Sequence, residues 1–434
     1  MQRLWRCFVR YSKYPSYRDS GTQWLGKVPE HWTSIKFKQA FMHKTKTTNH
    51  RLDCGSISFG NVVYKDNDKI PEETRASYQE VLDGEFLINP LNLNFDLKSL
   101  RTALSKLNVV VSTGYIVLQG KSDINKNYLR WLLFQFDVAH MKTLGAGVRQ
   151  TVNFTDIGNE YFRMPPLQEQ QTIANYLDNA TAKIDTLIQK QTKLIELLKE
   201  KRQAVISTAV TRGLDSSVAM KDSGVEWLGE IPIHWEVKKL KHIGEAIIGL
   251  TYSPSNIVDE NEGTLVLRSS NLQGGGLYYG DNVYVNSDIP YKLITRAGDI
   301  VICSRNGSRK LIGKNAMIDK ESEGVSFGAF TSVFRSNQNP FVFYILNSSL
   351  FKYQSGRFMT TTINQLTTGT LNAFQIALPP VGEQLDIVEY LHYKTTKIDT
   401  LITKSTKAID LLKEKRTALI SSCVTGKIDV RKVA

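Results

Sequence analysis

The chain has 434 residues, and at roughly 100–200 residues per domain this length predicts two to four domains and excludes a single small module. Lysine and arginine number 55 against 42 aspartate and glutamate residues, so the net charge is +13. The hydrophobic fraction of 41% is typical of a folded protein and excludes a largely disordered one. The positive surplus favours a polyanionic partner such as nucleic acid, although a modest basic excess also occurs in proteins that bind none.

The four cysteines are scattered, with no C-x-x-C pair and no histidine cluster beside them. They are Cys7, Cys54, Cys303 and Cys423. This pattern favours a reducing cytosol over a disulfide framework or a structural zinc site. No apolar run approaches the roughly 18 residues of a membrane span, and the N-terminus lacks the apolar stretch of a signal peptide. We therefore expect a cytoplasmic protein with no membrane contact and no bound metal.

The first predicted element is a short opening, residues 19–32, which reads DSGTQWLGKVPEHW. Residues 222–235 read DSGVEWLGEIPIHW and match it at nine of fourteen positions, at a constant offset of 203. We expect the shared tryptophans to anchor the chain where it enters each domain. His31 and His234 are expected to be turn residues rather than ligands or catalytic groups.

The segment that follows, about 36–164, is predicted to be a mixed α/β domain. The β-branched run at 108–118 indicates a strand, and 127–138 is typical of a helix. Polar side chains on the loops between such elements can reach phosphates and base edges. The DNA-contact candidates here are Asn92, Asn94, Arg101, Lys106, Arg149, Gln150 and Asn153. Any one of them alone fits a solvated loop, but as a set on a basic protein they indicate nucleic-acid binding.

Residues 165–213 are predicted to form a long helix. Pro165-Pro166 precede it, Gly213 lies near its end, and few glycines or prolines interrupt it. Its expected buried stripe alternates spacings of four and three. The stripe is Ile173, Leu177, Ala180, Ile184, Leu187, Gln191, Leu194 and Leu198. A single stripe of this kind would fit a helix packed on a globular core.

A second divergent segment, about 239–378, is also predicted to be mixed α/β. Runs at 299–304 and 326–334 indicate strands, and 340–353 is typical of a helix. Its DNA-contact candidates are Arg268, Asn271, Arg305, Asn306, Arg309, Lys310, Arg357, Thr361 and Asn364.

The chain closes with a second predicted long helix, 379–426. Residues 183–215 match 397–429 at 22 of 33 positions, at an offset of 214, so the chain is an internal duplication. The second stripe is Ile387, Leu391, Lys394, Ile398, Leu401, Ser405, Ala408 and Leu412. Two matching stripes favour helices that pack on each other as a coiled coil.

The direction of this helix pair follows from the connectivity of the chain. A domain of about 150 residues has a radius of gyration near 15 Å, so the second helix must begin close to where the first ended. The two helices are therefore expected to be antiparallel, with one domain at each end and a pseudo-two-fold axis across them. The echoes between the divergent segments are faint, for example Gly84-Glu85 beside Gly298-Asp299.

The shared blocks resemble a known family. The two openings, together with the Pro-Pro-x-x-Glu-Gln blocks at 165–170 and 379–384 and the matching helices, are similar to the specificity subunit of bacterial type I restriction-modification systems. The resemblance extends from about Tyr17 to about Val430. It implies an α+β fold with two mixed α/β target recognition domains joined by two long antiparallel coiled-coil helices.

The resemblance also implies a function and partners. Each recognition domain would read one half of a bipartite target in double-stranded DNA, and the helices would act as spacers and dock two methyltransferase subunits. Endonuclease/translocase subunits would complete the complex. S-adenosylmethionine, ATP and Mg²⁺ would belong to these partners, with no cofactor in this chain.

The expected organisation assigns every part of the chain to one role. It comprises an N-terminal lead-in (1–18), the first recognition domain (19–164), the first spacer helix (165–213), a linker and the second recognition domain (214–378), the second spacer helix (379–426) and a C-terminal tail (427–434).

Two other classes of protein remain open. An enzyme would need a titratable cluster shared by both copies, but the sequence has no P-loop, nucleophile elbow, H-E-x-x-H or deaminase pattern. The Asn89-Pro90-Leu91-Asn92 run lacks the second proline and the aromatic ring of the amino-methyltransferase motif. We therefore expect no catalytic residues. A coiled-coil assembly protein, or a stand-alone DNA-binding protein without restriction partners, is the other alternative, and pure assembly would leave two large basic domains without a role.

Overall fold

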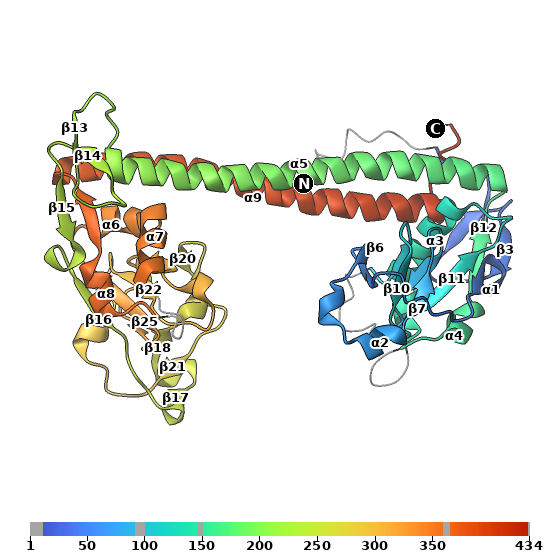
Figure 1. Ribbon diagram of the computed structural model, residues 1–434, viewed down its shortest axis with the longest axis horizontal. Coiled ribbons are helices and arrows are strands. Elements are labelled where there is room, and N and C mark those ends of the chain that lie inside the picture. The colour runs from blue at the N-terminus through green and yellow to red at the C-terminus, as the bar shows by residue number, and fades with distance from the viewer. Residues whose placement is uncertain (1–11, 92–99, 146–150, 359–364, 433–434) are drawn as a thin grey trace. The chain divides into compact units, whose positions relative to one another are not determined.

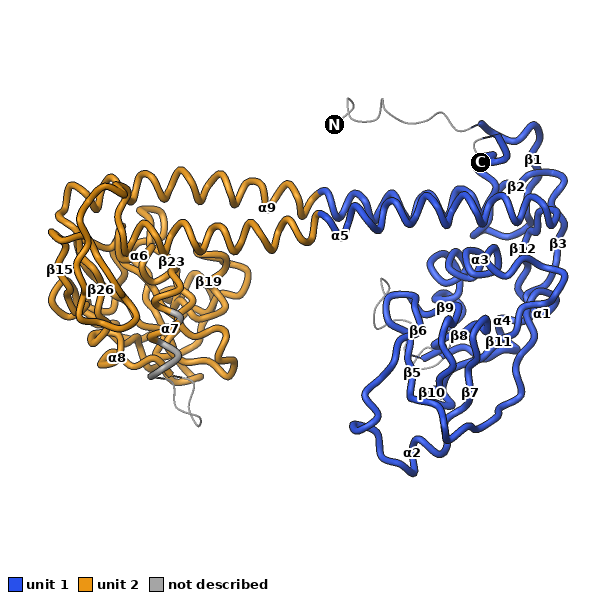
Figure 2. The backbone as a smooth tube through the Cα atoms, turned by 45° about the horizontal axis from the view of Figure 1, so that its top comes forward, with its two compact units in different colours: residues 1–190, 408–434 blue, residues 191–407 orange. Residues whose placement is uncertain are grey.

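The protein, described here as a computed structural model, forms two compact units (Figures 1 and 2). The structure describes residues 12–91, 100–145, 151–358 and 365–432. Unit 1 comprises residues 1–190 and 408–434, and unit 2 comprises residues 191–407. Each unit combines β-sheets, short helices and one half of each long helix. Within the described residues, no helix is both long enough and apolar enough to cross a membrane.

Unit 1 is built on a six-stranded sheet with the order β4-β11-β8-β9-β6-β5, and β1-β2, β3-β12 and β7-β10 pair separately. Its strands are β1 (Tyr17–Asp19), β2 (Lys27–Pro29), β3 (Thr33–Lys36), β4 (Phe41–His43), β5 (Gly55–Ser58), β6 (Asn61–Tyr64), β7 (Gln79–Val81), β8 (Phe86–Ile88), β9 (Thr102–Leu104), β10 (Val109–Val111), β11 (Ile116–Gly120) and β12 (Tyr161–Met164). Its short helices are α1 (Phe37–Ala40), α2 (Glu72–Ala76), α3 (Lys126–Ala139) and α4 (Phe154–Gly158). The predicted strand at 108–118 is in fact two strands, because a turn with a hydrogen bond from Tyr115 N to Ser112 O separates β10 from β11.

Unit 2 contains two four-stranded sheets, β16-β25-β22-β23 and β17-β21-β18-β24. Its strands are β13 (Met220–Asp222), β14 (Glu230–Pro232), β15 (Glu236–Lys239), β16 (Glu245–Ile248), β17 (Ile257–Val258), β18 (Thr264–Leu267), β19 (Leu272–Gln273), β20 (Gly276–Leu277), β21 (Tyr284–Val285), β22 (Ile300–Cys303), β23 (Asn315–Met317), β24 (Ser326–Phe327), β25 (Thr331–Arg335) and β26 (Gln375–Leu378). Its short helices are α6 (Asn339–Leu346), α7 (Ser349–Phe358) and α8 (Thr368–Ala373). The predicted helix at 340–353 therefore breaks into α6 and α7, and the break falls at Asn347 and Ser348.

The similar pairs Gly84-Glu85 and Gly298-Asp299 have the same structural role in both units. The glycine before each carboxylate has a φ of +84° or +88°, a left-handed conformation that favours glycine. Glu85 then accepts a hydrogen bond from Lys44 Nζ at 2.8 Å, and Asp299 accepts one from Arg335 Nη2 at 2.7 Å. Both carboxylates are buried. This sequence similarity therefore has a structural cause, since each acid holds a turn of the sheet in place.

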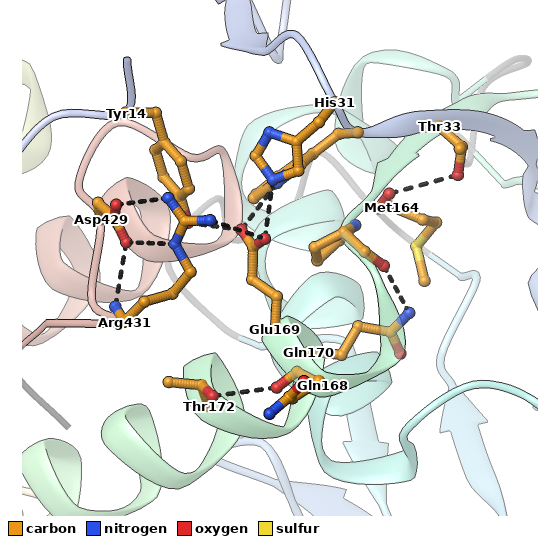
Figure 3. Close-up of polar contacts among 12 residues, drawn as sticks. Tyr14, His31, Thr33, Met164, Gln168, Glu169, Gln170, Thr172, Asp429 and Arg431 are labelled. Atoms are coloured by element: carbon orange, nitrogen blue, oxygen red, sulfur yellow. Dashed lines mark hydrogen bonds and ion pairs between the residues drawn. The ribbon is translucent and has the colours of Figure 1, made fainter. Parts of the chain in front are cut away.

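In unit 1, the shared opening and the Pro-Pro-x-x-Glu-Gln block meet at Glu169 (Figure 3). Glu169 is 6% exposed, accepts a hydrogen bond from Trp32 Nε1 at 2.9 Å, and lies 2.8 Å from His31 Nε2. Gln170 donates to the carbonyl of Pro165 at 2.9 Å and closes the first turn of α5 (Leu167–Arg212). The tryptophan anchors the chain as predicted, whereas the histidine contacts a carboxylate rather than only forming a turn.

Unit 2 repeats this junction at Glu383. His234 Nε2 lies 2.8 Å from Glu383, Trp235 Nε1 donates to it at 3.0 Å, and Gln384 donates to the carbonyl of Pro379 at 2.9 Å. The opening and the closing block are thus shared between the two copies because they build one joint, which fixes the start of each long helix.

Both described ends of the chain add a further layer around Glu169 in unit 1 (Figure 3). The hydroxyl of Tyr14 donates to Glu169 at 2.7 Å, and burial together with this carboxylate raises the pKa of Tyr14. Arg431 forms an ion pair with Asp429 at 2.7 Å, and its Nη1 lies 3.8 Å from Glu169. The amide of Asp429 also donates to the carbonyl of Ser12 at 2.8 Å. Unit 1 is therefore completed by segments from both ends of the sequence.

The two long helices, α5 and α9 (Val381–Val424), pack together as an antiparallel pair. Arg416 Nε donates to Asp185 at 2.9 Å in unit 1, and Arg202 Nε donates to Asp399 at 2.9 Å in unit 2. Each residue of one pair lies 214 positions from its counterpart, so the ion pairs are repeats of one interaction. This confirms the predicted antiparallel helices and the internal duplication.

The predicted stripe is partly wrong. Leu187, Leu194 and Leu401 are 47%, 41% and 49% exposed, and Lys394 is also exposed. The neighbouring apolar residues at 188 and 195 turn inward instead and are half-buried. The remaining stripe positions are buried or half-buried. They are Ile173, Leu177, Ala180, Ile184, Gln191, Leu198, Ile387, Leu391, Ile398, Ser405, Ala408 and Leu412.

Candidate nucleic-acid interface

Each unit presents a loop between two paired antiparallel strands at an equivalent place in its sheet. We call these the hairpin loops. Residues 89–101 join β8 to β9 in unit 1, and residues 304–314 join β22 to β23 in unit 2. The two loops differ in sequence although the strands that carry them correspond.

A second loop in each unit leads into a short helix whose first turn it caps, and we call these the capping loops. They are residues 145–153 before α4 and residues 359–367 before α8. Asn153 accepts from Asp156 N at 3.0 Å, and Thr367 accepts from Thr370 N at 3.0 Å. The two caps are 214 positions apart, and each accepts a hydrogen bond from an equivalent free backbone amide in the first turn of its helix.

One backbone hydrogen bond joins the hairpin loop to the capping loop in both units. Val152 N donates to Pro90 O at 3.2 Å in unit 1, and Leu366 N donates to Ser304 O at 2.7 Å in unit 2. Both donors and both acceptors are 214 positions apart. In each unit, a contact that does not depend on side-chain identity therefore joins the two loops at residues that the structure describes.

In unit 1, the predicted DNA-contact residues lie in different environments. Asn92, Asn94, Arg149 and Gln150 lie outside the described residues. Arg101 ends the hairpin loop, and its amide donates to Asp137 of α3. Lys106 is exposed just after β9. The amide oxygen of Asn153 is used by the helix cap, so this side chain has a structural role.

Burial raises the pKa of Asp137 to about 6, against the lowering effect of the Arg101 and Thr102 hydrogen bonds. The carboxylate is fully buried and receives the amide that closes the hairpin loop. The ionisation of Asp137 is therefore coupled to the anchoring of this loop.

In unit 2, the hairpin loop contains four of the predicted residues. These are Arg305, Asn306, Arg309 and Lys310, and all but the half-buried Asn306 are exposed. Asn306 donates to Ser269 Oγ at 3.2 Å, which brings the hairpin loop against the loop that follows β18. The backbone of Arg305 also forms an isolated antiparallel β-bridge with Gln365 of the capping loop. Arg305 and Asn306 therefore connect the hairpin loop to both neighbouring loops, and together these loops form the surface considered next.

Other predicted residues of unit 2 do not all reach this surface. Asn271 is 0% exposed, and its amide donates to Tyr278 O at 2.9 Å, so it holds a turn instead of contacting a ligand. Arg357 lies in α7, where its side chain is not described, and Thr361 and Asn364 lie outside the described residues.

The surface opens into a cleft of about 470 Å³ in unit 2. Its walls include Arg268, Tyr252 and Phe330, and Phe330 is 60% exposed. Arg268 pairs with Asp281 at 2.8 Å, and the Arg305 guanidinium lies 5.3 Å from the centre of the Phe330 ring. The two aromatic residues are not recognisable from the sequence, because single aromatic residues between strands give no periodic signal.

The chemistry of this surface is that of binding. Guanidinium groups, amides and aromatic faces can contact phosphates, base edges and bases. The nearby thiol of Cys303 is buried, and burial raises its pKa, so it remains a protonated thiol. Among the described residues, no group of three histidine, cysteine or acidic side chains could hold a metal ion.

Comparison with known proteins identifies the family of the chain. The family model for the type I restriction modification DNA specificity domain matches residues 94–197 and 232–411, which is more than half of the chain. The chain belongs to this family. It is a specificity subunit with DNA-recognition domains, a class that is the non-catalytic component of the restriction-modification complex.

Individual relatives of this specificity subunit match most or part of the chain. It is 24% identical over 422 residues to the type I restriction enzyme MjaVIII specificity subunit of Methanocaldococcus jannaschii, covering 93% of this chain and 95% of that protein. It is 26% identical over 211 residues to the EcoKI specificity subunit of Escherichia coli K12, covering 46% and 44%. A chain solved in a study of assembly and conformational transition of the type I R-M system has the same fold, with a TM-score of 0.64, 16% identity and coverage of 92% and 98%.

Proposed function

We propose that each unit of this specificity subunit reads one half of a bipartite DNA target through its paired hairpin and capping loops. The observation that carries the proposal is the backbone hydrogen bond that joins these loops at equivalent positions in both units. Because the bond uses no side chain, the loop sequences are free to diverge and to read different bases. The first recognition domain is then residues 19–164, and residues 214–378 contain a linker and the second recognition domain. The rest of the chain is a lead-in (1–18), two spacer helices (165–213 and 379–426) and a tail (427–434).

A domain exchange tests this proposal. Residues 239–378 are replaced with the corresponding segment of another specificity subunit, and the matched control replaces residues 36–164. Methylated adenines are then mapped in DNA from cells that express the chain with its methyltransferase. We expect each exchange to change one half of the methylated sequence and to leave the other half intact. A change in both halves, or in neither, would contradict the two-module function.

A single substitution tests the surface of unit 2 more finely. Arg305→Ala is expected to relax base selection within one half-site, because loss of one arginine contact costs about 1–3 kcal/mol of discrimination. Lys320→Ala is the matched control, since this lysine is also exposed in unit 2 but lies outside the loops. Equal effects of the two variants would place base reading elsewhere.

The exposed leucines of the helices support docking of two methyltransferase subunits. Leu187 and Leu401 are 47% and 49% exposed, and Leu197 and Leu411 are 50% and 54% exposed. Each pair is related by the same offset of 214, so the chain offers the same exposed apolar residues twice. Two copies of one partner fit such a duplicated surface. Endonuclease/translocase subunits would join this assembly, and S-adenosylmethionine, ATP and Mg²⁺ would be bound by the partner subunits.

We also propose that the helices act as spacers between the half-sites. Four residues inserted after Lys190 add one helical turn, about 6 Å, which corresponds to one or two base pairs of about 3.4 Å. The methylated sequence is expected to show a longer gap, or methylation is expected to stop. An unchanged gap with full methylation would refute the spacer role.

A further inference from the structure

The hairpin formed by β5 and β6 ends in an unusual turn. Two residues, Phe59 and Gly60, join the strands, and both have positive φ angles, 48° and 76°. This two-residue turn favours Asn-Gly, because asparagine and glycine tolerate the left-handed conformation. Phe59 is the one non-glycine residue with a positive φ in the described part of the chain. A bulky side chain at such a position costs about 1–2 kcal/mol.

The fold gains no packing energy in return for this strain. Phe59 is 91% exposed, more than any other large hydrophobic residue of the described chain, of which Tyr291 at 76% comes next. Neither the turn nor the core therefore explains a phenylalanine here. A strained and exposed aromatic residue is a feature of binding sites.

The turn formed by Phe59 and Gly60 lies against the end of the hairpin loop of unit 1, residues 89–101. A Cβ added to Gly60 would come within 2.7 Å of Leu100 Cδ1, so Leu100 packs directly on the turn. Asn61 of β6 also pairs with Leu104 of β9, the strand that leaves this loop. The position of Phe59 is thus fixed by the same segment that is proposed to read DNA.

The surroundings of Phe59 are basic. A small cleft of about 70 Å³ is lined by Phe59 together with Lys106, Arg130 and Arg416. The two arginines form ion pairs with Asp178 and Asp185, and Lys106 is exposed and forms no ion pair with a described residue. Lys106 is therefore the exposed cation beside the ring, and an exposed ring next to such a cation favours a polyanion over an apolar protein surface.

We infer that Phe59 is a DNA wedge, whose ring enters the base stack beside the half-site read by unit 1 while Lys106 contacts a flanking phosphate. Apolar side chains inserted between base steps unstack them and bend the duplex. The turn strain serves this role, because it holds the ring outward before DNA arrives. This inference rests on the proposed function.

The test compares three variants of the full chain. Phe59→Asn removes the ring and relieves the strained turn, Phe59→Trp retains an aromatic wedge, and Tyr64→Ala removes another exposed aromatic residue, 59% exposed, from the same hairpin. The probe is a duplex with the target found by methylation mapping, in which 2-aminopurine replaces one base at a time around the half-site of unit 1. Its fluorescence rises where a base loses its stacking partner.

We expect the wild-type chain and Phe59→Trp to raise the fluorescence at one step. Phe59→Asn should abolish this rise and weaken binding roughly five- to a hundredfold, the range expected from base–aromatic stacking of 1–3 kcal/mol. Its melting temperature should equal or exceed that of the wild type, so lost folding cannot explain the result. Tyr64→Ala should behave as the wild type.

Two results would overturn the wedge. Wild-type DNA affinity and fluorescence for Phe59→Asn would show that the ring does not enter DNA. Loss of copurifying methyltransferase with unchanged DNA affinity would identify Phe59 as a protein contact. The exchange of residues 239–378 separates these outcomes from failure of the proposed function, because it keeps Phe59 in place and reports on half-site reading alone.

Discussion

Glu169 and Glu383 occupy the same motif position in two environments, and this allows a stability prediction with an internal control. Trp32 and Tyr14, which donate to Glu169, are 0% and 3% exposed. Glu169→Ala leaves both donors buried without a partner, at about 1–3 kcal/mol each, so we expect a loss of about 2–6 kcal/mol, centred near 4 kcal/mol. Glu383→Ala leaves Trp235 as the one fully buried donor among these contacts, and we expect a loss of about 1–3 kcal/mol.

The difference of about 2 kcal/mol is measurable by scanning calorimetry of the full-length chain. At about 2–4 °C per kcal/mol for a unit of this size, Glu169→Ala should melt about 4–8 °C below Glu383→Ala. Glu169→Gln retains one acceptor oxygen and should fall between Glu169→Ala and the wild type. Equal shifts for the two alanine variants would refute the argument that the added contacts from the chain ends stabilise unit 1.

Three further predictions concern the loops and helices. The folded pKa of Asp137, about 6, lies above its unfolded value, so the unfolding free energy should fall by about 2 kcal/mol as pH rises from 4 to 7. Asp137→Asn should lack this fall in urea titrations, and parallel curves for the two proteins would contradict the prediction. Alanine at Arg416 and Asp185 in a double-mutant cycle should give a coupling of about 0.5–1 kcal/mol in urea unfolding, whereas zero coupling would show that the pair contributes nothing. Leu197→Glu or Leu411→Glu alone should leave one bound methyltransferase subunit by native mass spectrometry, and retention of two would exclude these leucines from docking.

The long helices were predictable from sequence because identical blocks repeat with a helical period. Their inward faces were less predictable. Leu187 and Leu194 are followed by Ile188 and Ile195, so two adjacent apolar stripes compete, and only packing decides between them. Sequence spacing alone cannot make that choice.

The candidate interface was predictable as a set of polar loops but not as an arrangement. The contact that joins the loops, Val152 N to Pro90 O, uses backbone atoms and leaves no residue signature. Asn271 is a residue whose type suggested DNA contact but whose role is structural. An asparagine can contact a base or hold a turn, and its complete burial here assigns it to the turn. Phe330 was missed because one exposed aromatic residue has no pattern to recognise.

The involvement of both chain ends in unit 1 has a consequence for synthesis in the cell. Unit 2 is contiguous in sequence, whereas unit 1 needs residues 408–434 to cover its helix and its Glu169 joint. At about 5–20 residues per second, roughly 10–40 s separate the synthesis of residue 190 from that of residue 408. During this interval the ribosome carries an incomplete unit 1 with exposed apolar surface, while unit 2 emerges whole. The N-terminal half of the protein is therefore the later one to complete its fold.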